Sequence, residues 1–141
     1  MLTRALLILV LIGGSLALSD GARAETKILA LGLSDHPVTE AELADGKAPP
    51  VPKFNTPGVA YVLVGDVKKG DTVEVRLSLK GTSLNHNIET ADADKATLLL
   101  QAGKAGVPAG GWPEGTYQAE VKITRDGKTL IEEKSAPVAF E

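Results

Sequence analysis

The residues of this sequence best suited to hydrolytic chemistry stand side by side, at Ser34, Asp35 and His36. A histidine activates a serine nucleophile when it bridges that serine and an acid, beside donors that hold the developing oxyanion. Adjacent residues of one loop point in different directions, and the chain has no G-x-S-x-G nucleophile elbow. The segment is therefore predicted to be a solvated turn in which Ser34 or Asp35 caps its own backbone, and the protein is not expected to be an enzyme.

Metal binding is the second chemistry to consider. Glu89, Asp92 and Asp94 form an acidic cluster that could offer oxygen ligands to Ca²⁺, but the EF-hand pattern and the glycine that turns such a loop are missing. His36 and His86 could fill only part of a tetrahedral zinc shell, because the chain contains no cysteine. The acidic cluster is expected to be a solvated loop, with Ca²⁺ binding left open, and no metal or other cofactor is expected.

A glycine-rich loop, residues 103–111, precedes the only tryptophan, Trp112. The loop contains a lysine, but it lacks the Lys-Ser/Thr end of a phosphate-binding loop and leads toward a predicted strand rather than a helix. It is predicted to be a crossover between two sheets. Its later part, Ala105 to Trp112, could alternatively present an inhibitory loop to a protease.

The first 24 residues have the pattern of a secretory signal peptide. Arg4 precedes the apolar run 5–18, and Ala22-Arg23-Ala24 supplies small residues at the two positions that signal peptidase recognises. The apolar run is too short for a membrane span, which needs about 20 residues. We expect cleavage after this triplet and a single mature domain, residues 25–141, in the periplasm or secreted beyond it.

Composition excludes further classes of function. The net charge of the chain is −3, and it becomes more acidic when Arg4, Arg23 and Asp20 leave with the signal peptide, so nucleic acid is an unexpected partner. The absence of cysteine excludes a disulfide staple, a thiol nucleophile and a lipid-anchored amino-terminal cysteine. The core is therefore expected to hold by packing alone.

Short β-strands are predicted along most of the mature chain, because apolar residues recur with a period of two. The pattern is clearest in 72–80, where valines and leucines alternate with polar residues, and Asp126-Gly127 is a two-residue hairpin signal. Pro137 predicts an edge position or a break. The expected strands are 26–33, 59–67, 72–80, a short edge strand within 84–88, 95–101, 117–124, a returning strand from Thr129, and 138–140.

Two further features concern surfaces. The segment 34–57 is rich in proline and is predicted to be an extended strap over the domain, with one short helical turn where Thr39 and Glu42 have capping-box spacing. The strand 59–67 is apolar on both faces. One of these faces, formed by Ala60, Val62 and Val64, is predicted to pack beneath the strap or to bind a partner.

The run Pro113-Glu114-Gly115-Thr116-Tyr117-Gln118-Ala119 resembles the start of the penultimate strand in immunoglobulin-like and fibronectin type III-like domains. In those domains a tyrosine corner places the tyrosine two residues before a core position, which here is Ala119. The resemblance implies an all-β, antiparallel sandwich of about seven strands. Trp112, Pro113, Gly115 and Tyr117 are accordingly expected to form a structural corner, with contact to a ligand as the alternative.

A similar Gly-Thr-Tyr corner occurs in small periplasmic copper-resistance β-sandwiches, whose copper sites use His and Met. The mature segment has only His36 and His86 and no Met, so copper binding does not follow. The expected function is an interaction or accessory module for an envelope protein, as a monomer or weak homodimer without a membrane span. Alternatives are a protein that binds a small ligand or metal between strap and loops, and a secreted protease inhibitor.

Overall fold

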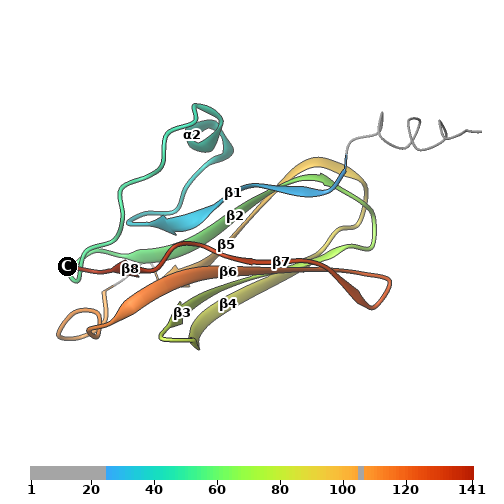
Figure 1. The fold of residues 1–141 in the computed structure, drawn as a ribbon. Coiled ribbons are helices and arrows are strands. Elements are labelled where there is room, and N and C mark those ends of the chain that lie inside the picture. The colour runs from blue at the N-terminus through green and yellow to red at the C-terminus, as the bar shows by residue number, and fades with distance from the viewer. Residues whose placement is uncertain (1–24, 105–106) are drawn as a thin grey trace, which may run out of the picture.

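The computed structural model describes residues 25–104 and 107–141, which form two antiparallel β-sheets packed face to face, with one short helix (Figure 1). The predicted all-β antiparallel sandwich is confirmed, whereas the predicted signal peptide, residues 1–24, lies outside the described residues. The elements are β1 (Lys27–Ser34), α2 (Glu40–Ala44), β2 (Gly58–Val67), β3 (Thr72–Leu79), β4 (Thr82–Thr90), β5 (Lys95–Lys104), β6 (Thr116–Arg125), β7 (Lys128–Lys134) and β8 (Val138–Ala139).

The smaller sheet has the strand order β1-β2-β5 and the larger has the order β4-β3-β6-β7, with β8 also paired with β6. β7 and β8 both pair with β6, which confirms the predicted break at Pro137. The β6–β7 hairpin turns on Asp126 and Gly127, and both have the positive φ angle that a tight two-residue turn requires. Local turn chemistry therefore sets the register of this edge.

The core lies between the sheets and is made by alternate residues of the central strands. Val73, Val75 and Leu77 of β3 are buried, and Val121 and Ile123 of β6 lie opposite the two valines. Burying one such side chain contributes about 1.5–3 kcal/mol. The predicted alternation of apolar and polar residues along β3 is therefore confirmed as an alternation of buried and less buried positions from Thr72 to Leu77.

The two faces of β2 are exchanged relative to the sequence prediction. Ala60, Val62 and Val64 are completely buried within the core between the sheets, so they are not a surface beneath the strap or for a partner. Side chains alternate along a strand, so the face directed away from the core carries Val59 and Tyr61 instead. Both faces of β2 are buried. Because both faces are also apolar, the sequence does not indicate which one packs against the other sheet.

The strap, residues 34–57, arches over the outer face of the smaller sheet (Figure 1). Its helix α2 begins with the predicted capping box, in which the side chains and backbones of Thr39 and Glu42 bond reciprocally. The side-chain amide of Gln101 in β5 holds the backbone of Val38, accepting from its N–H at 2.7 Å and donating to its carbonyl at 2.9 Å. The strap is thus fastened to the sheet rather than trailing from it.

β4 is longer than predicted. It runs from Thr82 to Thr90 instead of lying within 84–88, because its polar residues extend the pairing with β3 without an apolar alternation to reveal it. In the part of the chain that the structure describes, no helix is both long and apolar enough to cross a membrane.

Candidate functional site

One end of the sandwich is closed by the rings of Trp112, Tyr117 and Phe140. Tyr117 and Phe140 are stacked with ring centroids 3.9 Å apart, and Trp112 meets them edge to face at 5.8 and 5.5 Å. Aromatic pairs of this geometry contribute about 0.5–1.5 kcal/mol beyond the area that they bury. All three rings are buried, so together they close this end of the core to solvent.

The polar atoms of Trp112 and Tyr117 both donate hydrogen bonds to backbone carbonyls. The indole Nε1 of Trp112 donates to the carbonyl oxygen of Thr56 in the strap at 2.8 Å. The hydroxyl of Tyr117 donates to the carbonyl oxygen of Pro113, four residues upstream. The second bond is the one that the tyrosine-corner resemblance implies, and the first joins the loop before β6 to the strap.

Gly115 permits the turn between these two rings. Its φ angle is +135°, and a Cβ atom there would lie 2.8 Å from the side chain of Leu79 and 2.7 Å from that of Lys80. A larger residue would be both strained and crowded. The structure thus brings together all four residues that the sequence singles out at this corner, Trp112, Pro113, Gly115 and Tyr117.

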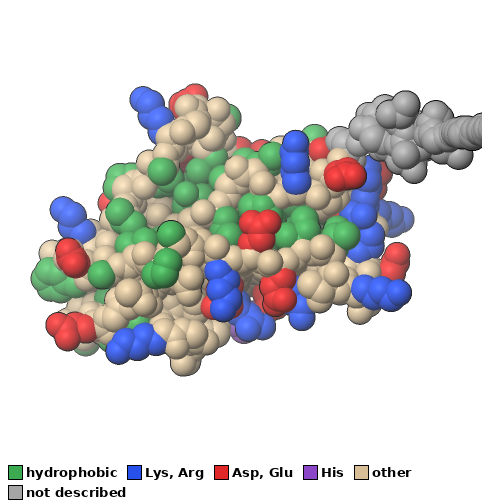
Figure 2. Space-filling view, in the orientation of Figure 1, with side chains coloured by type: hydrophobic (Ala, Val, Ile, Leu, Met, Phe, Trp, Pro, Cys, Tyr) green, Lys and Arg blue, Asp and Glu red, His purple; other side chains and the backbone are tan. Residues whose placement is uncertain are grey.

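A hollow of about 630 Å³ adjoins this corner. Phe54 of the strap lines the hollow and is 51% exposed, whereas Trp112 is only 7% exposed and forms part of the floor. Glu114 and Glu141 also line the hollow, and none of its described lining residues is Lys or Arg. Figure 2 shows one group of hydrophobic side chains at this end of the molecule, at the left tip of the view, and others spread along the rest of the visible face. The sequence prediction missed Phe54, because only the path of the strap brings it beside Trp112.

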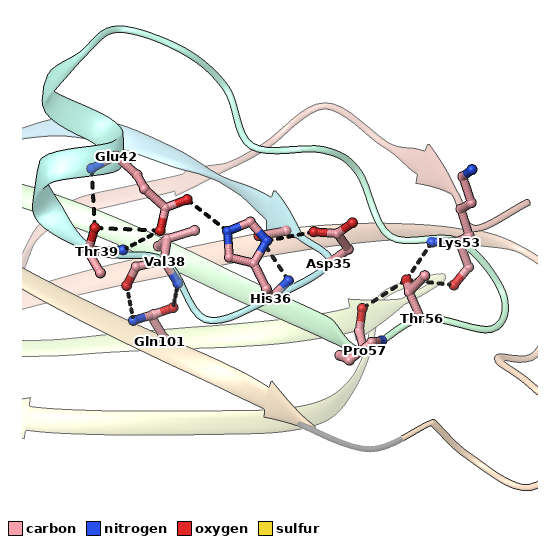
Figure 3. Close-up of polar contacts among 10 residues, drawn as sticks. Asp35, His36, Val38, Thr39, Glu42, Lys53, Thr56, Pro57 and Gln101 are labelled. Carbon is pink, nitrogen blue, oxygen red and sulfur yellow. Dashed lines mark hydrogen bonds and ion pairs between the residues drawn. The ribbon is translucent and has the colours of Figure 1, made fainter.

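His36 forms a clasp between the end of β1 and α2 (Figure 3). Its Nε2 lies 2.7 Å from Glu42 Oε2 and its Nδ1 lies 2.6 Å from Asp35 Oδ1. The bonds to Glu42 and then Asp35 raise the pKa of His36, and the bond to His36 lowers the pKa of Glu42. Both ring nitrogens face carboxylates, and Ser34 Oγ lies at the longer distance of 3.4 Å from Nδ1, which is the nitrogen that already meets Asp35. Asp35, His36 and Glu42 therefore form a clasp. Ser34, Asp35 and His36 do not have the arrangement of a catalytic triad, in which the histidine bridges the serine and the acid through different nitrogens.

Replacing Glu42 with glutamine is expected to return the pKa of His36 toward its ordinary value of 6.5, because the largest of its stabilising hydrogen bonds loses its charge. The raised pKa means that the clasp stabilises the folded chain below pH 6.5 and loses that contribution as the pH rises through the folded-state pKa of His36. The lowered pKa of Glu42 means that the contribution is also lost in strong acid. NMR titration of the imidazole protons measures the pKa directly.

Glu40→Gln is the matched control, because Glu40 lies in the same helix but bonds to Thr97. The side chains of His36 and Glu42 are both about 40% exposed, so solvent screens their interaction and the change in stability should be small. An unaltered His36 titration in Glu42→Gln would show that the clasp does not form.

The acidic cluster is not assembled into a metal site. Asp94 accepts from the backbone N–H of Lys69 at 2.8 Å, and Asp92 lies 3.7 Å from the ammonium of Lys95. Glu89 lies on β4. Within residues 25–104 and 107–141, no three His, Asp or Glu side chains are grouped so that they could hold a metal ion.

An ion pair with a buried carboxylate, at the opposite end of the sandwich, has no counterpart in the sequence predictions. Asp71 is completely buried, and Arg125 donates to both of its carboxylate oxygens at 2.8 Å. The carboxylate also accepts from the N–H of Lys68 at 3.0 Å, and Arg125 also donates to the hydroxyl of Thr26 at 2.7 Å. The bond to Arg125 is the main cause that lowers the pKa of Asp71. The pair ties the β2–β3 turn to β6 and to the segment before β1.

No protein-family model matches this chain, and neither a curated protein nor a solved structure matches it. The fold and the site define the protein as an antiparallel β-sandwich with a fastened strap and an aromatic end.

Proposed function

We propose that this chain is an exported, non-enzymatic binding module with immunoglobulin-like topology, and that it docks on an envelope protein through the hollow at its aromatic end. Export is supported by the signal-peptide pattern of residues 1–24. Binding is supported above all by one observation, the half-exposed ring of Phe54 beside a hollow whose floor is apolar and buried.

The immunoglobulin-like assignment is supported by the order of the strands. The first, second and fifth strands share one sheet, and the third, sixth and seventh share the other, as in immunoglobulin-like domains. The fourth strand, β4, lies beside β3, where variable-type domains have an added strand. Tyr117 begins the penultimate long strand and bonds to the backbone upstream, as a tyrosine corner does.

The chemistry of the hollow favours a particular kind of partner. Interfaces take most of their binding energy from a few residues, most often Trp, Tyr and Arg, that lie in well-packed pockets. Phe54, Trp112 and Phe140 offer such a pocket, and the carboxylates of Glu114 and Glu141 give it a negative border. The expected partner segment is an apolar side chain flanked by Lys or Arg, because opposite charges steer encounter and fix register.

A photoreactive phenylalanine analogue at position 54 is expected to crosslink the exported protein to one discrete partner in intact cells. The matched control is the same analogue at Val51, which is 48% exposed on the same strap but does not line the hollow. Reversing both border charges, Glu114→Lys with Glu141→Lys, should remove the adduct without lowering the melting temperature. An absent adduct at position 54, or equal adducts at both positions, would refute docking at this end.

Small-ligand binding is the second candidate, and Tyr61 favours it. Its ring lies over Gly32 of β1, it is buried, burial raises its pKa, and its hydroxyl has no hydrogen-bond partner among the described residues. It lines a hollow of about 240 Å³ beneath α2 together with Leu29, Leu43 and Lys47. These groups suit a small carboxylate with an apolar tail. Saturable binding of octanoate that Tyr61→Phe weakens would support this function, and no saturable binding would exclude it.

Protease inhibition receives no support from the described part of the loop that could present it. Gly110 and Gly111 turn it tightly, and the N–H of Trp112 donates to the carbonyl of Phe54 at 2.9 Å. An inhibitory loop must instead be extended and accessible. Ala105, at which that predicted loop begins, lies outside the described residues.

A further inference from the structure

The first part of the strap, residues 35–50, is a loop whose two ends are joined at its base. The N–H of Asp35 donates to the carbonyl oxygen of Pro50 at 3.1 Å. Loops closed in this way are compact units that often carry function. Val38 is the only buried residue of this loop, and Gln101 of β5 holds its backbone with two hydrogen bonds (Figure 3). The arm from Asp35 to Val38 is therefore fixed to the sheet.

The second arm of the loop, residues 39–49, contains α2 and has no buried residue. Among the described residues, two side-chain hydrogen bonds join this arm to the rest of the protein. Glu40 accepts from the hydroxyl of Thr97 in β5 at 2.6 Å, and Glu42 lies 2.7 Å from His36. A segment with few buried apolar contacts opens locally at a small free-energy cost. These two bonds are the tethers of the arm.

The second arm also forms one side of the hollow of about 240 Å³ that contains Tyr61. Leu43 and Lys47 line the hollow from the arm, and Ala30 and Tyr61 line it from the smaller sheet. No residue of either tether lines the hollow. Breaking the tethers would therefore move one side of the hollow without changing the groups that line it. Tyr61 is only 5% exposed, so a ligand reaches its hydroxyl when the arm moves away.

The hydroxyl of Tyr61 is the polar group that the sheet offers to a ligand here. The ring lies over Gly32, where a Cβ atom would come within 2.7 Å of the hydroxyl oxygen. An aromatic ring covers a glycine of a neighbouring strand without needing a hydroxyl. A buried hydroxyl without a partner is costly, and that of Tyr61 has none among the described residues. A hydrogen-bond acceptor on a ligand would satisfy it.

We infer that residues 39–49 are a lid, which opens when the two tethers break and thereby controls access to the Tyr61 hollow. The inference rests on the second candidate function, the binding of a small carboxylate at Tyr61. Lys47 lies on the lid and Tyr61 on the floor, so a carboxylate held between them joins the two sides. A ligand that bonds to both binds the closed state more tightly than the open one, and it shifts the lid toward closure.

Thiol labelling measures the opening of the lid without any ligand, because the chain has no cysteine of its own. The probe is Ala30→Cys, which places a thiol in the hollow beneath the lid. Thr97→Val removes one tether, and Glu42→Gln removes the charge from the other while keeping a residue that suits the capping box. Together they should speed the reaction of the thiol with a maleimide about threefold or more.

Matched changes on the larger sheet serve as controls. Glu132→Gln with Thr82→Val makes the same chemical changes at exposed positions and should leave the labelling rate unchanged. Thr129→Cys, an exposed thiol on β7, should react equally fast with and without the tethers. Equal labelling rates of Ala30→Cys in the tethered and untethered proteins would overturn the inference.

Octanoate tests the candidate function separately from the lid. It should slow the labelling of Ala30→Cys, and Lys47→Gln or Tyr61→Phe should weaken this protection. Tether-dependent labelling that octanoate does not slow would support the lid and refute the candidate function. Protection by octanoate together with labelling that is independent of the tethers would support the candidate function and overturn the lid.

Discussion

Replacing Trp112 with alanine should lower the free energy of unfolding by about 3–4 kcal/mol, as truncation of a buried tryptophan typically does. The ring is 7% exposed, meets Tyr117 and Phe140 edge to face, and donates to the carbonyl of Thr56. Its loss would open the end of the core and release the strap from the loop. Urea unfolding followed by far-ultraviolet circular dichroism measures the change, since the variant has no tryptophan to report fluorescence.

Two further variants distinguish a role in core packing from a role in ligand contact at this end. Tyr117→Phe removes only the hydroxyl that bonds to Pro113 and should cost about 1 kcal/mol. Phe54→Ala removes a half-exposed ring from the same hollow and should change stability by about 0.5 kcal/mol or less. If Trp112→Ala were as stable as Phe54→Ala, the Trp112 ring would be a contact residue and not part of the core.

The second large effect is expected from Arg125→Met. It leaves the buried carboxylate of Asp71 without its charge partner, and breaking a fully buried pair in this way costs about 3–5 kcal/mol. Because the Arg125 side chain is 34% exposed, we expect the low end of that range, about 3 kcal/mol. The stability that Asp71 contributes should be present above pH of about 4 and lost as the pH falls through its lowered pKa. Denaturant unfolding of the wild type and the variant between neutral pH and pH 3 measures both effects.

The double variant Asp71→Asn with Arg125→Met is the control for the charge. It should be more stable than Arg125→Met alone, because no uncompensated charge remains. Arg76→Ala, which removes the exposed pair between Arg76 and Glu74, should cost about 1 kcal/mol or less. Equal effects of Arg125→Met and Arg76→Ala would mean that the Asp71 carboxylate is solvated.

Local chemistry explains which parts of the fold were predictable. The alternation in β3, the Asp126-Gly127 turn and the capping box of Thr39 and Glu42 each depend on residues close in sequence, and all three are confirmed. The bond from the Tyr117 hydroxyl to the Pro113 carbonyl is local in the same sense, because it spans only four residues.

Features that depend on distant contacts were not predictable in the same way. Asp71 and Arg125 are 54 positions apart, and neither residue type signals burial. Phe54 becomes part of the candidate site only because the strap returns beside Trp112. The inward face of β2 was assigned incorrectly because both faces are apolar, so Ala60, Val62 and Val64 could be placed only by the packing of the two sheets.

The emission of the single tryptophan tests most directly the central claim that Trp112 is the buried floor of the aromatic end while exposed residues such as Phe54 make the contacts. In the free native protein we expect blue-shifted emission that acrylamide quenches weakly, because the ring is enclosed by Tyr117 and Phe140 and bonded to Thr56. Phe54→Ala should leave that emission nearly unchanged. A red-shifted emission that acrylamide quenches as readily as in the unfolded chain would contradict the claim.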